Sequence, residues 1–239
     1  MQPFIGKKRQ NNIMANNNVK KGEPQSAEQP LISGDAFIVK YKKAIIGVVA
    51  AIVIVVVAAV LYTNYVARPR ETKASTMLAK SQQMFDNQMY NMALNGDSVS
   101  FGGFLQVADE YGGTAAGNLA NLYAGLCYAQ LGQWEQAATY IEKFKGKGDK
   151  MISPAAQGAL GNVYAHTGNL DKAVELLKKA AGAADNNSLS PTFLIQAGEI
   201  LESQGKTEEA LKMYQEVKDK YFNSVQYQTI DKYIERVTK

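Results

Sequence analysis

Few residues of this 239-residue chain are of a type that could carry out chemistry. It holds one cysteine, Cys127, and one histidine, His166. A lone cysteine forms neither an intrachain disulfide nor a cysteine-based metal cluster, and a single histidine lacks the partners of a hydrolytic or metal site. No glycine-rich phosphate loop or serine elbow occurs. The sequence therefore predicts a protein that is not an enzyme and that takes no cofactor, no metal and no small-molecule substrate.

The remaining reactive side chains have ordinary structural interpretations. We expect Cys127 to be a buried small hydrophobe. His166 is expected to be a partly exposed helix residue close to Gly168, with a pH-sensitive contact as the alternative. Glu208 and Glu209 stand near the start of an expected helix, where negative charge suits the helix dipole, so they do not indicate an acid/base pair.

Positive charge is concentrated at the N-terminus. The formal net charge is +4, and residues 1–43 hold eight Lys/Arg against three Asp/Glu, which leaves 18 against 19 in the remainder. A near-neutral remainder has no broad field to attract nucleic acid, so no nucleic-acid partner is expected. Residues 1–38, rich in Asn, Gln, Lys and Pro, predict a disordered basic cytoplasmic tail. Contact of that tail with anionic lipid or ribosomal RNA is the alternative.

Residues 44–61 form an uninterrupted apolar run. As a helix this run spans roughly 27 Å, enough to contact lipid across the hydrocarbon core. Tyr62 and Tyr65 follow it, as aromatic residues do at a membrane interface. We therefore predict a transmembrane signal anchor at 39–66. A cleaved signal peptide fits poorly, because the preceding region is long and no Ala-x-Ala site follows. The basic tail favours a cytoplasmic N-terminus, and the inverted topology of a cytoplasmic adaptor is the alternative.

Three segments of the C-terminal half align without gaps. Their turn glycines, Gly132, Gly168 and Gly205, are spaced 36 and 37 residues apart. Small residues that would let two antiparallel helices approach closely recur at Gly125, Gly161 and Gly198 and at Ala137, Ala173 and Ala210. Large apolar residues follow at Ile141, Leu177 and Tyr214. The turn glycines can adopt a positive φ and end the first helix of each pair.

This pattern resembles the tetratricopeptide repeat (TPR) family over residues 118–224, although the consensus Trp and the inter-repeat Pro are missing. The resemblance implies an all-α fold, a TPR helical-hairpin solenoid preceded by one transmembrane helix, with repeats at 118–151, 154–187 and 191–224. Residues 67–117 are expected to form a linking helix and degenerate N-terminal hairpins, and residues 225–239 a capping helix. Ser153 and Ser190, each followed by proline, are expected to cap helices.

The resemblance also implies a protein-binding groove, because TPR solenoids hold peptides or partner helices on the concave face of their first helices. Carried over to this sequence, the groove would contain Leu119, Leu122, Leu126, Gln130, Gly158, Asn162, Ala165, His166, Ile195, Glu199 and Glu202. Packing beneath the preceding helix is the alternative for the three leucines. The Lys/Asn set that some TPR adaptors use to hold a peptide carboxylate is missing, so we expect no recognition of a C-terminal carboxylate.

Residues 104–132 are similar to the YfgM-type family, the ancillary subunit of the bacterial Sec translocon, especially to its relatives in the Bacteroidetes. That likeness implies a single-pass inner-membrane protein with a periplasmic TPR domain. It also implies the SecYEG translocon, a membrane-anchored periplasmic chaperone and exported proteins as partners. The expected function is a scaffold at the translocon. An adaptor for envelope assembly, cell-wall synthesis or division, and an enzyme or its regulatory subunit, are the alternatives.

Overall fold

The computed structural model describes residues 33–97 and 101–239, and the elements it assigns there are helices apart from one isolated β-bridge between Asp97 and Phe101. The expected all-α fold class is confirmed. The chain divides into two compact units, Met1–Val56 and Val57–Lys239. Of the first unit only residues from 33 onward are described, so the prediction of a disordered tail falls for residues 1–32 outside the described part.

Helix α1 (Ser33–Tyr62) contains the apolar run. It begins at Ser33, so the prediction of disorder is wrong for residues 33–38; Ala36, Phe37 and Ile38 extend the apolar helical sequence towards the N-terminus. Every side chain from residue 37 to residue 66 is exposed. Among the described residues, this is the one helix long and apolar enough to cross a membrane.

A short π-helix, η1 (Thr63–Ala67), follows α1. The Thr63 hydroxyl donates to the Ala59 carbonyl at 2.8 Å, and the Asn64 amide donates to the Val60 carbonyl at 3.0 Å. Side chains that bond to carbonyls four residues back compete with the backbone ladder, which accounts for a local change of helical pitch at this place.

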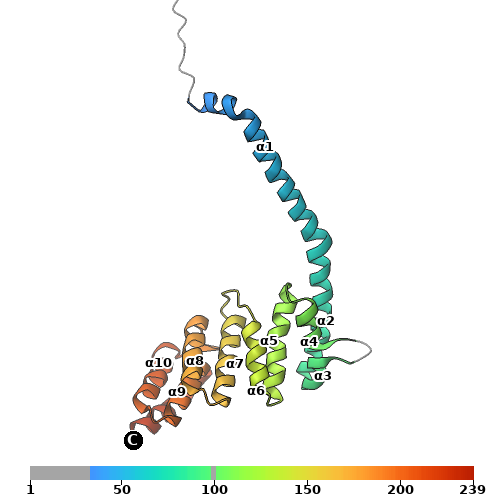
Figure 1. Ribbon diagram of the computed structural model, residues 1–239. Helices are drawn as coiled ribbons and strands as arrows, with labels where there is room; N and C mark the ends of the chain where they lie inside the picture. The colour runs from blue at the N-terminus through green and yellow to red at the C-terminus, as the bar shows by residue number, and fades with distance from the viewer. Residues whose placement is uncertain (1–32, 98–100) are drawn as a thin grey trace, which may run out of the picture. The chain divides into compact units, whose positions relative to one another are not determined.

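The unit Val57–Lys239 contains the remaining helices, stacked in chain order (Figure 1). They are α2 (Arg68–Asp86), α3 (Tyr90–Asn95), α4 (Gly103–Glu110), α5 (Ala115–Gln130), α6 (Trp134–Lys143), α7 (Ile152–His166), α8 (Leu170–Ala184), α9 (Ser190–Ser203), α10 (Thr207–Lys220), the 3₁₀ turn η2 (Val225–Gln228) and α11 (Ile230–Thr238). Helices α5 and α6, α7 and α8, and α9 and α10 pack as hairpins, and α6 contacts α7 just as α8 contacts α9.

The recurring glycines are where the two helices of each hairpin meet. A Cβ on Gly125 would lie 2.4 Å from Ile141 Cγ1 and 2.9 Å from the Ala137 carbonyl oxygen, and one on Gly198 would lie 2.4 Å from the Tyr214 ring. The turn glycines have φ values of 73°, 80° and 73°, in the region that favours glycine. Both sequence-based interpretations of these glycines are confirmed.

Helix α2 is held against the start of α5 by polar contacts. The Glu71 carboxylate accepts hydrogen bonds from the backbone N–H groups of Ala115 at 2.7 Å and Ala116 at 2.9 Å. These groups have no partner within their own helix, and a carboxylate beside them also suits the helix dipole. Arg70 donates to the Glu110 carbonyl at 2.7 Å. The contacts place the N-terminal ends of α2 and α5 at the same edge of the unit.

The capping residues of α7 and α9 differ from those expected. Asp149 accepts hydrogen bonds from the backbone of Ile152 and Ser153 and from the Ser153 hydroxyl, so Ser153 lies in the first turn and Asp149 provides the cap. These bonds, led by that of the hydroxyl, lower the pKa of Asp149 to about 2. The Ser190 hydroxyl instead donates to a carbonyl of α8 at 2.7 Å, and Asn186 accepts from the N–H groups before α9. Neither serine caps its helix: Asp149 bonds the first N–H groups of α7, whereas Asn186 bonds only N–H groups that precede α9.

Helix α11 closes the unit. Ile230 is buried, and Tyr233, Ile234 and Val237 pack against the last hairpin. The expected helix over 225–239 is wrong at its start, because Val225–Gln228 is a 3₁₀ turn whose Tyr227 N–H donates to the Ser224 hydroxyl at 3.2 Å.

An ion pair links α11 to α9. Arg236 donates to both oxygens of Glu202, with Nε and Nη2 at 2.8 and 2.7 Å, and the hydroxyl of the buried Tyr214 donates to the same carboxylate. Burial alone raises the pKa of Glu202, but the hydrogen bonds from Arg236 and Tyr214 outweigh burial and hold that pKa below its ordinary value.

We expect Glu202→Gln to lower the melting temperature at pH 7 and to have a smaller effect in acid. A carboxylate whose pKa is depressed by folding stabilises the protein above its unfolded-state pKa, and this contribution is lost as pH falls through the folded-state pKa. Thermal melts of wild type and variant, followed by circular dichroism in detergent at pH 7 and pH 3, measure the difference. A difference in melting temperature that stays the same at both pH values would contradict this role of the Glu202 carboxylate.

Candidate peptide-binding groove

A groove of about 510 Å³ lies between the first helices of two successive hairpins, α7 and α9. It is lined by Asn162, Ala165, His166, Gln196, Glu199, Ile200 and Ser203. The Asn162 amide donates to the Gln196 side-chain oxygen at 3.4 Å and joins the two walls. Because residues three and four apart share a face of a helix, the lining positions form one continuous stripe on each helix.

His166 stands at the C-terminal end of α7 and stacks on Trp134, the first residue of α6. The ring centroids are 3.9 Å apart and the planes are nearly parallel, with an angle of 1°. His166 is a helix residue close to Gly168, as expected, and it is exposed where partial exposure was expected. The stack holds the imidazole at one end of the groove against an aromatic ring, so this end offers a flat, partly apolar surface.

Most of the side chains that line the groove are of polar types, and one is a carboxylate. Glu199 is exposed, and the other lining residues are a histidine, two amides, a hydroxyl, an alanine and an isoleucine. Such a surface can bind a polar peptide segment through side-chain hydrogen bonds, and Glu199 can pair with a cationic side chain.

The described residues add neither a cluster of metal ligands nor an accessible thiol to this surface. In the ranges 33–97 and 101–239 no three His, Cys, Asp or Glu residues gather as metal ligands would. Cys127 is fully buried, as expected, and burial raises the pKa of its thiol to about 12. The thiol is therefore protonated near neutral pH and is not a nucleophile.

The structure brings four of the sequence-predicted groove residues together: Asn162, Ala165, His166 and Glu199. For two other residues the prediction of an accessible groove position is wrong, because Leu122 is 6% and Ile195 is 8% exposed. Both stand three residues before the small glycine of their hairpin, as does the buried Gly158. A Cβ on Gly158 would lie 2.2 Å from the Phe193 ring. This repeat position therefore faces the adjoining hairpin and belongs to the core.

The other predicted residues lie outside the groove between α7 and α9. Leu119 and Leu126 are partly buried and pack against Leu122 and residues of α6 and α7. The leucines therefore belong to the core, but only Leu119 also packs against the preceding helices, as the alternative had it. Gln130 is exposed at the end of α5. Glu202 is engaged by Arg236 and Tyr214, so its carboxylate serves the C-terminal cap.

Gln196, Ile200 and Ser203 also line the groove and were not among the residues predicted from the sequence. Accessible positions of these first helices stand one and five residues after the small glycine, which are Asn162 and His166 in one hairpin and Glu199 and Ser203 in the next. Extending the spacing of Asn162 and His166 to the last hairpin would have selected Ser203 in place of Glu202. The signal in the sequence that could have identified them is the spacing of the polar residues Gln196, Glu199 and Ser203, which are three and four positions apart and so share one face of α9.

Stacked helical hairpins with small residues at their closest approach, and a groove on their first helices, define a helical-repeat protein with an interaction surface. The sequence profile of the tetratricopeptide repeat-like domain family matches residues 36–237. The chain belongs to this family, whose fold is a scaffold for protein–protein interaction.

Solved structures agree on the fold. The nearly identical TPR-like repeats of a putative kinesin light chain of Podosopora anserina superpose with a TM-score of 0.55 at 14% identity, covering 70% of this chain and 86% of that chain. A singly substituted variant of the same repeats gives the same TM-score and identity, and 85% of that variant's chain is covered. No curated protein has a matching sequence.

Proposed function

We propose that this chain is a single-pass membrane scaffold whose groove between α7 and α9 binds proteins at the Sec translocon of the bacterial inner membrane. The N-terminus lies in the cytoplasm and the repeats lie in the periplasm. Partners are the SecYEG channel, a membrane-anchored periplasmic chaperone and exported proteins. The likeness of residues 104–132 to the YfgM-type family supports this choice of partners.

The observation that carries the proposal is an interaction groove in a chain that also has a long exposed apolar helix. The side chains of 37–66 are exposed throughout, and such a surface in water would be costly. A bilayer covers it, because a helix satisfies its own backbone hydrogen bonds in lipid. Anchoring then raises the local concentration of the groove near membrane-bound partners, which strengthens otherwise weak contacts.

The test is in-cell crosslinking of the full chain followed by affinity purification and mass spectrometry. The proposal predicts recovery of SecY and of a periplasmic chaperone, and loss of both when the repeats are deleted or residues 44–61 are replaced by an unrelated anchor. Recovery of cell-wall or outer-membrane assembly factors without SecY would contradict the translocon as the site of action and support an envelope adaptor.

Topology is tested separately by cysteine labelling at exposed positions such as Gln133 and Glu175. A membrane-impermeant thiol reagent is expected to label these positions in cells whose inner membrane is intact. Labelling only after that membrane is permeabilised would contradict a periplasmic repeat unit. The native Cys127 is fully buried, so the wild-type chain serves as the unlabelled control.

A further inference from the structure

A second surface lies at the edge where residues 57–67 lead into α2. Glu71 and Arg70 fix the start of α2 to the turn between α4 and α5. The Asn118 side chain, in the first turn of α5, then holds the segment after α6: its amide donates to the Lys145 carbonyl at 3.0 Å, and its oxygen accepts from the Lys145 N–H at 2.8 Å. The α4–α5 turn and the α6–α7 segment therefore lie at the same edge.

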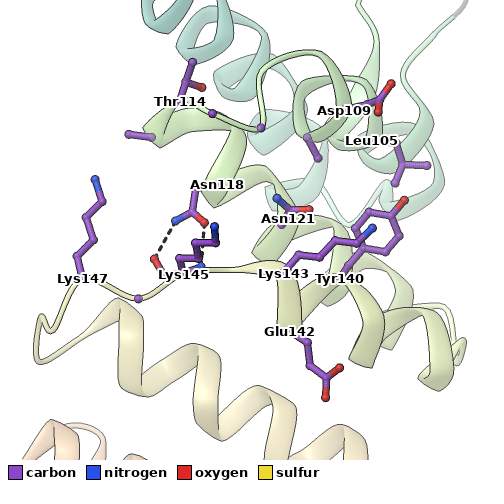
Figure 2. Close-up of a pocket in the computed structure, with 15 residues that line it drawn as sticks. Leu105, Asp109, Thr114, Asn118, Asn121, Tyr140, Glu142, Lys143, Lys145 and Lys147 are labelled. Atoms are coloured by element: carbon purple, nitrogen blue, oxygen red, sulfur yellow. Dashed lines mark hydrogen bonds between the residues drawn. The ribbon is translucent and has the colours of Figure 1, made fainter.

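A pocket of about 690 Å³ lies between the α4–α5 turn and the segment after α6. Lys143, Lys145 and Lys147 line it in alternation along this segment (Figure 2). No ion pair joins Lys145 or Lys147 to an acid within the part of the chain that the structure describes. Asn118 fixes the backbone at Lys145. The lysines of this segment are therefore held beside the α4–α5 turn by the backbone, and not by contacts of the lysine side chains.

Apolar side chains continue this basic segment. Lys150 precedes Met151 and Ile152, which are 53% and 48% exposed. Nearby acids are partly engaged: Asp149 caps α7, and Glu142 pairs with Lys172 at 3.7 Å. Lys150 lies 3.5 Å from Asp185 in a pair whose members are both largely exposed, so the pair is weak. Asp109 also lines the pocket, and Lys143 lies over the Tyr140 ring. Residues 143–152, termed here the basic–apolar segment, therefore combine two cations without an ion pair among the described residues, Lys145 and Lys147, with exposed apolar tips.

We propose that the basic–apolar segment docks onto anionic phospholipid headgroups of the bilayer that holds α1, an inference that rests on the proposed membrane anchoring. Leu61, the last residue of the apolar run, is seven positions before Arg68 (68 − 61), or about 10 Å along a helix. That is about one Debye length at physiological salt, so the entry edge of the unit lies within reach of the surface charge.

The composition of the segment favours lipid over an acidic protein as its partner. Lysines bind lipid phosphates without needing a fixed geometry, and Met151 and Ile152 can enter the boundary between headgroups and acyl chains. Docking would hold the repeat unit against the membrane surface through a second contact, beyond the covalent connection to the anchor.

The test uses the full chain in lipid nanodiscs, one set of phosphatidylcholine and one with a quarter of phosphatidylglycerol. Met151→Cys carries a polarity-sensitive fluorophore, and Gln133→Cys in the α5–α6 turn is the reference position. Headgroup-nitroxide lipids quench a label that touches the surface. We expect strong quenching of the label at position 151 in the anionic discs only, and weak quenching at position 133 in both.

The charge dependence comes from a triple variant, Lys145→Gln, Lys147→Gln and Lys150→Gln. Each lysine at an anionic surface contributes about fivefold to the docking equilibrium, so the ratio of docked to undocked protein should fall on the order of 100-fold. The matched control replaces the exposed Lys178, Lys179 and Lys212 with Gln and should retain docking.

Equal quenching of the label at position 151 in neutral and anionic discs, or no effect of the first triple variant, would overturn the inference. A crosslink from position 151 to an acidic protein without lipid quenching would also overturn it and assign the segment to a protein partner. A chain that fails to stay in the discs contradicts the anchor and hence the proposed function. Normal incorporation without contact at 151 refutes only the docking.

Discussion

Gly125→Ala is expected to lower the free energy of unfolding by about 1–3 kcal/mol, the usual cost of overpacking a close-packed interior. The added methyl group would lie 2.9 Å from both the Ala137 carbonyl oxygen and the Ile141 N–H nitrogen, which are backbone atoms of the facing helix. Backbone atoms cannot rotate away as a side chain can, so α5 and α6 must separate. The loss should exceed the roughly 1 kcal/mol that alanine gains over glycine in a helix.

Gly182→Ala provides the matched control for this prediction. Gly182 is also helical, in α8, but it is exposed and a Cβ there meets nothing within 4 Å. The same substitution should therefore stabilise the protein by about 0.5–1 kcal/mol. Chemical denaturation in detergent, followed by Trp134 fluorescence and circular dichroism, measures both variants. A neutral or stabilising Gly125→Ala would contradict the close approach of the two helices.

Glu199→Arg is expected to reduce recovery of groove-bound partners by about tenfold or more, which corresponds to about 1.4 kcal/mol of binding free energy. The change reverses the one carboxylate charge in the groove lining and fills part of its volume with a longer side chain. A partner segment that offers a cation to Glu199 would then meet a like charge, which costs affinity.

Glu175→Arg is the control, because Glu175 is exposed in α8, does not line the groove and undergoes the same change of charge. Quantitative mass spectrometry of crosslinked partners compares the two variants at matched expression, and circular dichroism checks that both are folded. Equal recovery from both would contradict a partner contact at Glu199. Loss in both variants would indicate that net charge, and not the groove, determines recovery.

The repeating architecture was predictable because the same residue types recur at the same spacing in each hairpin. Gly125, Gly161 and Gly198 recur at the closest approach of two helices, where a Cβ would lie within 3.0 Å of the facing helix. Because the same spacing occurs three times, it indicates which helices pair as hairpins. The turn glycines followed the same logic, since their positive φ values favour glycine over other residues.

Other features depend on contacts that no local pattern encodes. The cap of α7 comes from Asp149, and α5 receives Glu71 from another helix more than forty residues away. The position occupied by Leu122 and Ile195 faces the adjoining hairpin, which depends on how hairpins stack and on the bulk of Phe193 opposite Gly158. The polar groove residues Gln196 and Ser203 emerged only once that stacking was known.

The basic–apolar segment was likewise hidden in the sequence. Its lysines alternate with phenylalanine and glycine, a pattern typical of an ordinary exposed loop. The hydrogen bonds of Asn118 to Lys145 fix the segment beside the α4–α5 turn, and this tertiary contact makes the lysines one surface.

Site-specific photocrosslinking in living cells tests the central claim, that the groove between α7 and α9 holds a protein partner. A photoreactive benzoylphenylalanine at Ser203, inside the groove, is compared with one at Glu175, outside it; both positions are exposed on helices. We expect discrete protein adducts from position 203, identified as SecY, a periplasmic chaperone or exported proteins, and few or none from position 175. Adducts from position 175 with none from position 203 would contradict the claim that this groove is the binding surface.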